Sequence, residues 1–167
     1  LREAFFEQSD RYHMVSGSVL ENSWLDQLQD WAAGRPVLFL AEGLLMYLSE
    51  SEVRSLLTRL CERFPGAELV AEVSHSLIAE KLQSSRYLRW KFEHQLHLGP
   101  DAVFRSGVND SQAFARWDPR LSLLGDWVYY DDQEPKLQLL NWMGAVPFLR
   151  HIQWVVHYRL GTKPAES

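Results

Sequence analysis

The sequence has little of several features that define specialised classes of protein. Cys61 is the one cysteine among 167 residues, so no disulfide can form within the chain. No apolar run approaches the roughly 20 residues that a membrane-spanning helix needs. The opening residues, LREAFFEQSDR, are too acidic and too polar for a secretory signal. These absences favour a cytoplasmic protein with no membrane partner, and the helical apolar spacing around Cys61 predicts a buried thiol.

Positive charge is also scarce. The 22 acidic and 17 basic residues give a formal net charge of −5, and the sequence has no cluster of lysine and arginine of the kind that a phosphate backbone requires. We therefore expect no nucleic-acid partner. His94 and His97 lie close together, but a metal site needs more than two ligands and no carboxylate or cysteine completes the spacing. We expect no bound metal.

The apolar spacing of the first half predicts strands that alternate with helices. Hydrophobic residues make up 46% of the chain, as in an ordinary globular protein, so we expect a single domain over residues 1–167. The expected elements are strand, helix, strand, helix and strand, at 13–18, 23–33, 36–41, 49–64 and 68–73. Connections of this length place helices across a parallel sheet. The continuous apolar run at 36–41 predicts a strand in the middle of that sheet, buried on both faces.

Capping signals mark the two helices in this half. Ser23 and Asp26 form a capping-box-like pair, and Ser49 and Glu52 form the box S-x-x-E. Apolar residues then recur on one face of the second helix until Pro65-Gly66 ends it.

The second half of the chain is less regular. Its expected elements are helices at 76–96, 111–117 and 135–146 and strands at 121–130 and 152–160. Alternation in the last strand places Trp154, Val156 and Tyr158 on one face. Two late strands predict an antiparallel finish to a mostly parallel α/β sheet.

Polar residues follow the three strands predicted in the first half. In an open α/β sheet, ligands bind beyond the carboxyl ends of the strands. The residues at these ends are Ser18 and Val19, then Glu42 and Gly43, and then Glu72, Ser74 and His75. Glu42 is the sharpest candidate because it directly follows an apolar strand and Gly43 lets the backbone turn. The residues alone leave open whether Glu42 meets a ligand or only caps or salt-bridges a turn.

The segment VLFLAEGLLMYLSESEVRSLLTRLCERFPGAELVAEV resembles the core of the leucine carboxyl methyltransferase superfamily, especially its bacterial tetracenomycin polyketide O-methyltransferase-like branch. The most specific piece is the strand-end pattern E-G-x-L-x-Y-L, formed by Glu42, Gly43, Leu45, Tyr47 and Leu48. GSVLENSWLDQL resembles the family's segment after its third strand, and GDWVYYD and WVVHYRLG resemble its last two strands.

This resemblance implies a class I methyltransferase fold, a Rossmann-like sheet that is mostly parallel with antiparallel C-terminal strands, and S-adenosylmethionine as cofactor. It implies that Ser18, with the Val19 backbone beside it, receives the adenine amino group. Glu42, followed by Gly43, would lie by the methionine portion, where a carboxylate favours the cofactor's ammonium. Tyr47 would line the acceptor pocket.

The sequence departs from the family in its cofactor loop. No G-x-G-x-G run is present, and neither is the acidic strand end that binds the ribose hydroxyls in the family. By resemblance the chain begins inside the helix that leads to the family's third strand. We therefore expect the C-terminal portion of the enzyme, with its N-terminal strands missing and inactive as a fragment.

The expected reaction is methyl transfer to a hydroxyl or carboxylate of a small, polyketide-like molecule. A carboxylate acceptor needs no base, whereas a phenol or alcohol profits from one. His75 and Glu72 are the candidate bases, although His75 is also placed to cap the following helix. Arg105 can pair with an acidic substrate or form a surface salt bridge. Trp127 and Tyr130 can shape an aromatic pocket or fill the core.

A different class of function stays open. A Rossmann-like chain without its first strands exposes a sheet edge, which invites pairing with another copy or with a partner segment. The alternative is therefore a non-catalytic truncated domain that acts in homo-oligomer formation or partner binding.

Overall fold

The computed structural model describes residues 4–85, 90, 103–128 and 152–161. The chain divides into two compact units, Leu1–Arg35 and Pro36–Ser167. Several predicted features fall outside the described residues: His94, His97, Tyr130, the helix at 135–146 and most of the segment 86–96. No helix within the described ranges combines the length and apolarity needed to cross a membrane.

The first unit contains helix α1 (Ser23–Ala32), which confirms the predicted helix. The predicted cap of Ser23 and Asp26 is wrong. Asn22 occupies the N-cap position without a side-chain cap bond, so Ser23 is already the first helical residue. A capping box requires its serine one position earlier, outside the helix.

The predicted strand at 13–18 is also wrong. Residues 13–16 adopt no regular structure, and a bend and a turn follow before α1. A strand is stable only when a neighbour pairs with its backbone N–H and C=O groups. In the described part of this unit, the β-pairing is a single bridge between Ser9 and Tyr12, which leaves 13–18 without a strand partner.

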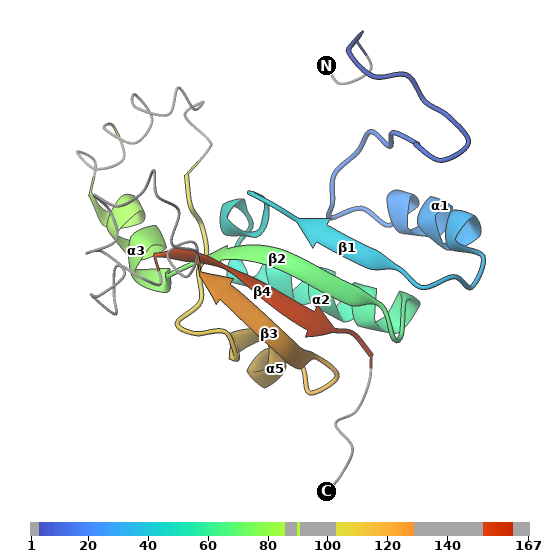
Figure 1. Cartoon of the computed structure of the whole chain (residues 1–167). Coiled ribbons are helices and arrows are strands. Elements are labelled where there is room, and N and C mark those ends of the chain that lie inside the picture. Colours follow the sequence, from blue (N-terminus) through green and yellow to red (C-terminus); the bar gives the residue numbers. More distant parts are fainter. Residues whose placement is uncertain (1–3, 86–89, 91–102, 129–151, 162–167) are drawn as a thin grey trace, which may run out of the picture. The chain divides into compact units, whose positions relative to one another are not determined.

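The second unit is built on a four-stranded sheet, drawn in Figure 1. Its strands are β1 (Leu38–Ala41), β2 (Glu68–Ser74), β3 (Ser122–Val128) and β4 (Gln153–Arg159). The order across the sheet is β1-β2-β4-β3. β1 and β2 are parallel, whereas β4 runs antiparallel to both β2 and β3. The predicted antiparallel finish is therefore confirmed.

Helix α2 (Glu50–Arg63) connects β1 to β2 and is the element that the sequence predicts best. Its capping box is formed as predicted: the Ser49 N–H donates to Glu52 Oε2 at 2.7 Å, and the Glu52 N–H donates to Ser49 Oγ at 3.3 Å. Its buried face consists of Val53, Leu56, Leu57, Leu60 and Cys61. The burial predicted for Cys61 is confirmed, and it raises the pKa of this thiol above the ordinary value.

Three shorter helices lie in the described part of this unit. They are the 3₁₀ turn η2 (Leu45–Tyr47), α3 (Ser76–Ser84) and α5 (Ala113–Trp117). α5 confirms the short helix predicted at 111–117. α3 begins where the helix at 76–96 was predicted, but it ends at Ser84, since Ser85 already has extended dihedral angles.

The core lies on the sheet face that α2 and α5 cover (Figure 1). Trp154, Val156 and Tyr158 of β4 are no more than 1% exposed, which confirms the predicted alternation of the last strand. The ring of Phe114 in α5 lies 5.5 Å from the Tyr158 ring. We refer to this side as the covered face and to the opposite side as the open face.

β1 contradicts the prediction of a central strand buried on both faces. It is an edge strand of the described sheet, and its burial alternates. Phe39 points to the covered side, where its ring meets Phe64 edge to face at 5.3 Å. Leu38 and Leu40 point to the open face and are 56% and 73% exposed. A continuous apolar run predicts two buried faces only when neighbours cover both of them.

Candidate functional site

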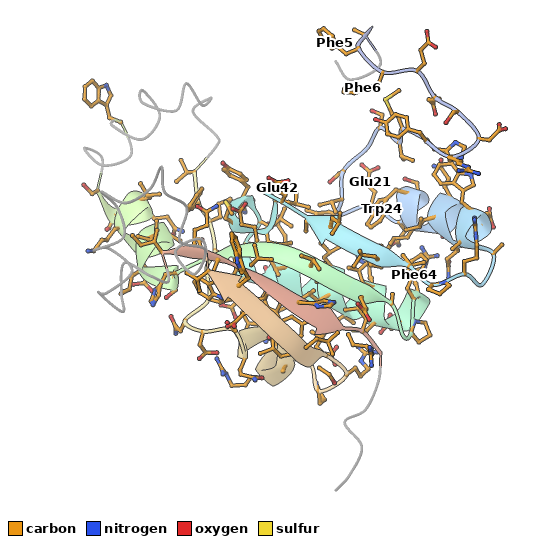
Figure 2. The ribbon with its side chains drawn as sticks, in the orientation of Figure 1. Phe5, Phe6, Glu21, Trp24, Glu42 and Phe64 are labelled. Carbon is orange, nitrogen blue, oxygen red and sulfur yellow. The ribbon has the colours of Figure 1, made fainter. Side chains whose placement is uncertain are left out.

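The carboxyl ends of β1 and β2 lie at the same edge of the sheet. The two strands are parallel, with Ala41 opposite Ala71. Glu42 follows β1 directly and is exposed, as Figure 2 shows at the end of this strand. Gly43 turns the chain with a φ of 56°. Such a left-handed conformation is one that glycine adopts without steric cost.

One hydrogen bond joins the two strand ends. The Gly43 N–H donates to Glu72 Oε2 at a distance of 2.9 Å. Glu72 is the residue of β2 that follows Ala71, so it lies level with the turn that begins at Glu42. The structure thus places a predicted base, Glu72, against a predicted cofactor residue, Gly43.

The same register reaches across the sheet to Trp127. Val155 of β4 lies directly opposite both Glu72 in β2 and Trp127 in β3. Residues directly opposite one another in a sheet project from the same face, so the three side chains form a row on the open face. With strands about 4.8 Å apart, Trp127 stands roughly 10 Å from the Glu72 position. Trp127 is 37% exposed.

His75 sits at the start of α3 and acts as its N-cap. Its Nδ1 accepts a hydrogen bond from the Leu77 N–H at 3.3 Å. In a neutral imidazole, the nitrogen that accepts carries no proton, so the proton is on Nε2. In this arrangement Nε2 donates hydrogen bonds, and a role as base would require the ring to give up its cap.

Ser74, beside His75, is built into the core. Its side chain is 1% exposed, and its hydroxyl donates to the Ser106 carbonyl at 3.5 Å. The backbone of the same segment pairs with a loop: the Val108 N–H donates to Ser74 O at 2.8 Å, and the Ser76 N–H donates to Val108 O at 3.2 Å. The end of β2 is therefore closed by the loop at 103–108, a role that the sequence did not reveal.

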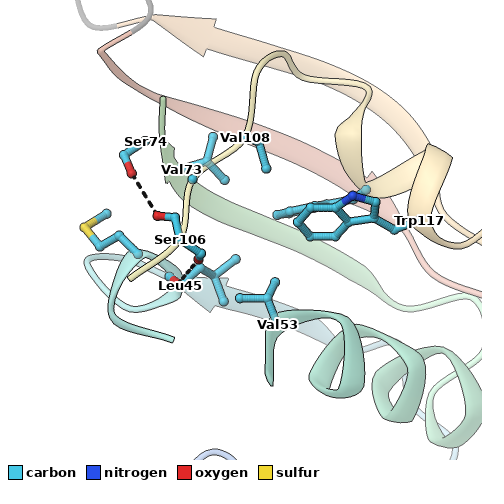
Figure 3. Close-up of a pocket in the computed structure, with 10 residues that line it drawn as sticks. Leu45, Val53, Val73, Ser74, Ser106, Val108 and Trp117 are labelled. Carbon is cyan, nitrogen blue, oxygen red and sulfur yellow. Dashed lines mark hydrogen bonds between the residues drawn. The ribbon is translucent and has the colours of Figure 1, made fainter. Parts of the chain in front are cut away.

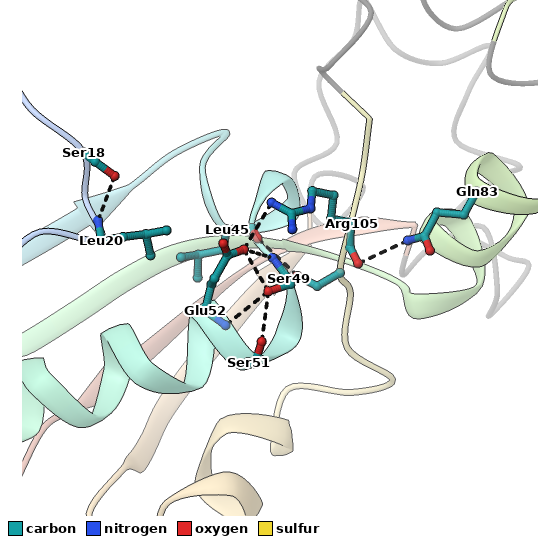
Figure 4. A network of polar contacts seen from close by, with 9 residues as sticks. Ser18, Leu20, Leu45, Ser49, Ser51, Glu52, Gln83 and Arg105 are labelled. Carbon is teal, nitrogen blue, oxygen red and sulfur yellow. Dashed lines mark hydrogen bonds and ion pairs between the residues drawn. The ribbon is translucent and has the colours of Figure 1, made fainter.

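Arg105 of this loop faces the cap of α2 (Figure 4). Its guanidinium lies 3.2 Å from Glu52 Oε2, and its backbone N–H donates to Met46 O at 2.7 Å. Hydrogen bonds from Ser49, first from its backbone and then from its side chain, hold the pKa of Glu52 below its ordinary value, and Arg105 adds to this effect. Of the two roles predicted for Arg105, the structure shows the salt bridge.

Tyr47 is half-buried in η2. Its ring meets that of Phe104 edge to face, with the centroids 5.5 Å apart. Both rings belong to an apolar cluster that includes Met46, Ala79 and Leu82. Tyr47 thus packs against the loop at 103–108.

A small apolar crevice lies on the covered face (Figure 3). The empty space between its lining residues, open solvent included, is about 220 Å³. Its lining comes from η2, α2, the end of β2, the loop at 106–108 and α5. No residue predicted to bind cofactor or substrate lines it, and Glu72 projects from the opposite face. The crevice therefore does not coincide with the predicted site.

Ser18 and Val19 belong to the first unit. The Ser18 hydroxyl accepts a hydrogen bond from the Leu20 N–H at 3.2 Å, and Val19 O accepts one from Trp24 Nε1 at 3.1 Å. Both residues therefore form part of a turn that leads into α1. Their approach to Glu42 stays a prediction. Across the described ranges, no group of three histidine, cysteine, aspartate or glutamate side chains is placed to hold a metal.

The sheet order and the polar strand ends define an α/β protein of Rossmann-like architecture. A solved structure supports this class: a DUF574 family protein from Streptomyces avermitilis MA-4680 is similar, with a TM-score of 0.56 and 15% sequence identity. The likeness covers 87% of this chain and 54% of that one. It shows the fold and confirms the predicted fold class.

The sequence comparisons find similarity to one family over part of the chain. The family model for leucine carboxyl methyltransferase matches residues 1–61. The chain is 26% identical to the tetracenomycin polyketide synthesis O-methyltransferase TcmP of Streptomyces glaucescens, over 95% of this chain and 56% of TcmP. It is 34% identical, over 44% of this chain, to a Parafrankia protein (strain EAN1pec) that is provisionally named an S-adenosyl-L-methionine-dependent methyltransferase. These matches confirm the predicted resemblance to the leucine carboxyl methyltransferase superfamily and its TcmP-like branch.

The chain spans just over half the length of TcmP, and it covers 24% of the Parafrankia protein. Both relatives are methyltransferases by name.

Proposed function

We propose that the polypeptide to which this sequence belongs is an S-adenosylmethionine-dependent O-methyltransferase that acts on a hydroxyl or carboxylate of a small, polyketide-like molecule. One observation carries the proposal. In a chain related to TcmP, the strand-end Glu42 is exposed beyond a parallel strand, and the turn that follows it is tied to Glu72. This edge of an α/β sheet is where such folds bind ligands.

The residues that the family resemblance assigns to the cofactor have the chemistry that it requires. The exposed Glu42 carboxylate suits the ammonium of the methionine portion. A serine hydroxyl has two acceptor sites, and the bond from Leu20 uses one at Ser18. The second can accept the adenine amino group beside the Val19 backbone. When bound, the cofactor supplies a methyl group already activated by its positive sulfonium.

The acceptor would lie toward the open face. The row formed by Glu72, Val155 and Trp127 leads from the strand ends across β4 and supports a flat molecule against the Trp127 ring. Tyr47 of η2 would also line the acceptor pocket. Arg105 would bind an acidic acceptor only by exchanging its bond to Glu52. These side chains would align the acceptor oxygen and exclude water, which is the protein's main contribution to this displacement.

His75 is the proposed base for an acceptor that must lose a proton. Nδ1 holds the α3 cap, so proton uptake at Nε2 requires the other tautomer and the loss of the bond from Leu77. A carboxylate acceptor avoids this step because it is already ionised. Glu72, the second candidate base, already accepts the Gly43 N–H with one oxygen.

Isothermal titration calorimetry with S-adenosylmethionine and S-adenosylhomocysteine tests the proposal. It is run on this chain and on the longest reading frame that contains it. We expect micromolar or tighter binding of both compounds by the longer polypeptide, and weak or no binding by the chain alone. Absence of binding by both polypeptides would overturn the assignment of function.

A role in oligomer formation is the second candidate, and β1 is the observation that favours it. This edge strand leaves Leu38 and Leu40 more than half exposed. Edge strands with apolar side chains pair readily with other chains. Analytical ultracentrifugation of the Leu38→Lys and Leu40→Lys double variant tests this role, with Leu124→Lys on the β3 surface as control. The candidate predicts a dimer that only the double variant disrupts, and a monomeric parent chain would exclude it.

We further propose that the protein acts on a small molecule in the cytoplasm, without a nucleic-acid or membrane partner. The net charge of −5 and the single buried cysteine support this proposal. Fractionation of cells that express a tagged chain would test it, because recovery with membranes or with nucleic acid would contradict it.

A further inference from the structure

We propose that Glu72 is a positioning residue for cofactor binding: its carboxylate holds the Glu42–Gly43 turn and so fixes the direction in which Glu42 leaves β1. This inference rests on the proposed function, and it changes the role of Glu72 from base to anchor. The first support is geometric. The Gly43 N–H reaches Glu72 Oε2 at 2.9 Å across 29 positions of sequence, between two strand ends.

Glu72 belongs to a strand with more backbone pairing than the strand that precedes the Glu42–Gly43 turn. β2 is paired on both sides, with β1 and with β4, and Glu72 lies opposite Val155. In the sheet formed by the described residues, β1 is a short edge strand that ends at Ala41, just before Glu42. A bond from the inner strand to the turn therefore transfers the order of β2 to the residue proposed to meet the cofactor.

The backbone conformation of Gly43 is the reason that the bond from Glu72 matters. Its φ of 56° lies in the left-handed region. Glycine can adopt this conformation, but it can adopt several others about as easily. A Cβ placed on Gly43 would have Glu72 Oε2 as a neighbour at 4.0 Å. Packing at that distance leaves the turn room, so the hydrogen bond, and not steric confinement, selects one conformation of the turn.

A carboxylate that anchors can be distinguished from one that takes up a proton. Glutamine keeps a carbonyl oxygen that can accept the Gly43 N–H, but it cannot serve as a base. Alanine removes both abilities. A positioning role therefore predicts rescue by Glu72→Gln, whereas a catalytic base predicts that Glu72→Gln and Glu72→Ala fail alike.

Glu68→Ala is the matched control. Glu68 lies on the same strand and the same face, and its carboxylate is bound to His157 at 2.7 Å and to Arg159 at 3.1 Å. It has no contact with the turn at Gly43. Loss of a carboxylate from β2 in general would affect both variants, while loss of the anchor affects Glu72→Ala alone.

The first measurement is amide hydrogen exchange at Gly43, followed by NMR on the longest polypeptide that contains this chain. The second is the Kd for S-adenosylmethionine together with kcat on the same variants. Loss of one hydrogen bond to a charged group corresponds to about a tenfold change. We expect Glu72→Ala to speed Gly43 exchange and to raise Kd, each about tenfold, with little change in kcat. Glu72→Gln should recover most of both losses, and Glu68→Ala should match the parent.

Two results would overturn the proposal. Gly43 exchange that is unchanged in Glu72→Ala would show that the bond does not hold the turn. A kcat that falls at least tenfold below the parent value in both Glu72→Gln and Glu72→Ala would restore the role of base. Failure of the proposed function looks different: the parent protein would not bind the cofactor, while Gly43 exchange would still report whether Glu72 anchors the turn.

Discussion

The carboxyl ends of β1 and β2 lie at one edge of the sheet but are built differently. At the end of β1, Glu42 and Gly43 are exposed, and a side-chain bond from Glu72 ties the turn. At the end of β2, Ser74 is 1% exposed, and backbone bonds with Val108 close the strand. The β2 end therefore serves as scaffold, while the β1 end exposes polar groups at the place where we propose that the cofactor binds.

The largest expected effect comes from adding a single methyl group at the end of β2, at Gly107. A Cβ at Gly107 would lie 2.7 Å from both Ser74 O and Ser76 N, which are backbone atoms that cannot move independently. We expect Gly107→Ala to lower the free energy of unfolding by about 3 kcal/mol, as overpacking does. Urea denaturation measures this change. Gly125→Ala is the control, since nothing lies within 4 Å of its Cβ position, and equal effects at both positions would refute the scaffold interpretation.

The second effect is a pH dependence of stability that comes from Tyr158 in the core. Burial raises the pKa of Tyr158 to about 12 from 10.0. The unfolded chain then loses this proton at lower pH than the folded chain, so the stabilisation is complete below pH 10 and is lost as the pH rises toward 12. We expect unfolding free energies to fall by about 2 kcal/mol across this range. Tyr158→Phe should remove most of this dependence, and an unchanged alkaline profile would contradict the argument.

At the β1 end, substitution of Gly43 should be milder. The nearest atom to its Cβ position is 4.0 Å away, so the cost of Gly43→Ala is conformational and not steric. Holding a residue with a side chain in the left-handed conformation lowers the free energy of unfolding by about 1.5 kcal/mol. Gly66→Ala is a matched control because Gly66 has a φ of 85° and open space around it. Thermal unfolding should give similar losses for both, and a loss at Gly43 as large as at Gly107 would erase the difference between the ends.

The smallest expected effect concerns His75 and tests whether it only caps α3 or also acts as a base. Its Nδ1 caps α3, so we expect His75→Ala to lower stability by about 0.5 kcal/mol, and His75→Asn to retain stability because asparagine is a strong N-cap. Chemical denaturation of the pair measures this. A stable His75→Asn variant without methyl transfer to phenols would identify His75 as a base, whereas full activity would leave it a cap alone.

Local signals predicted α2 well. The bounds of α2 follow from the Ser49 cap and the Pro65-Gly66 stop, which lie within the segment itself. The last strand was equally predictable, because its alternation places Trp154 and Tyr158 on one buried face. The position of Glu42 at the end of β1 was also correct, because it depends only on where an apolar run ends.

Features that depend on distant residues were not predictable in this way. The exposure of Leu38 and Leu40 depends on which neighbours cover β1, and the run of apolar letters does not contain that information. The bond between Gly43 and Glu72 joins residues 29 positions apart. The lack of a side chain at Gly107 is what lets the loop at 103–108 close on β2, and this contact likewise joins distant residues.

A crystal structure of the longest polypeptide with bound S-adenosylhomocysteine tests the central claim most directly. We expect the amino-acid ammonium of the ligand within hydrogen-bond distance of the Glu42 carboxylate, with the adenine amino group at Ser18 and the Gly43–Glu72 bond intact. A ligand bound away from the end of β1, or Glu42 paired with protein groups and turned from the ligand, would contradict it.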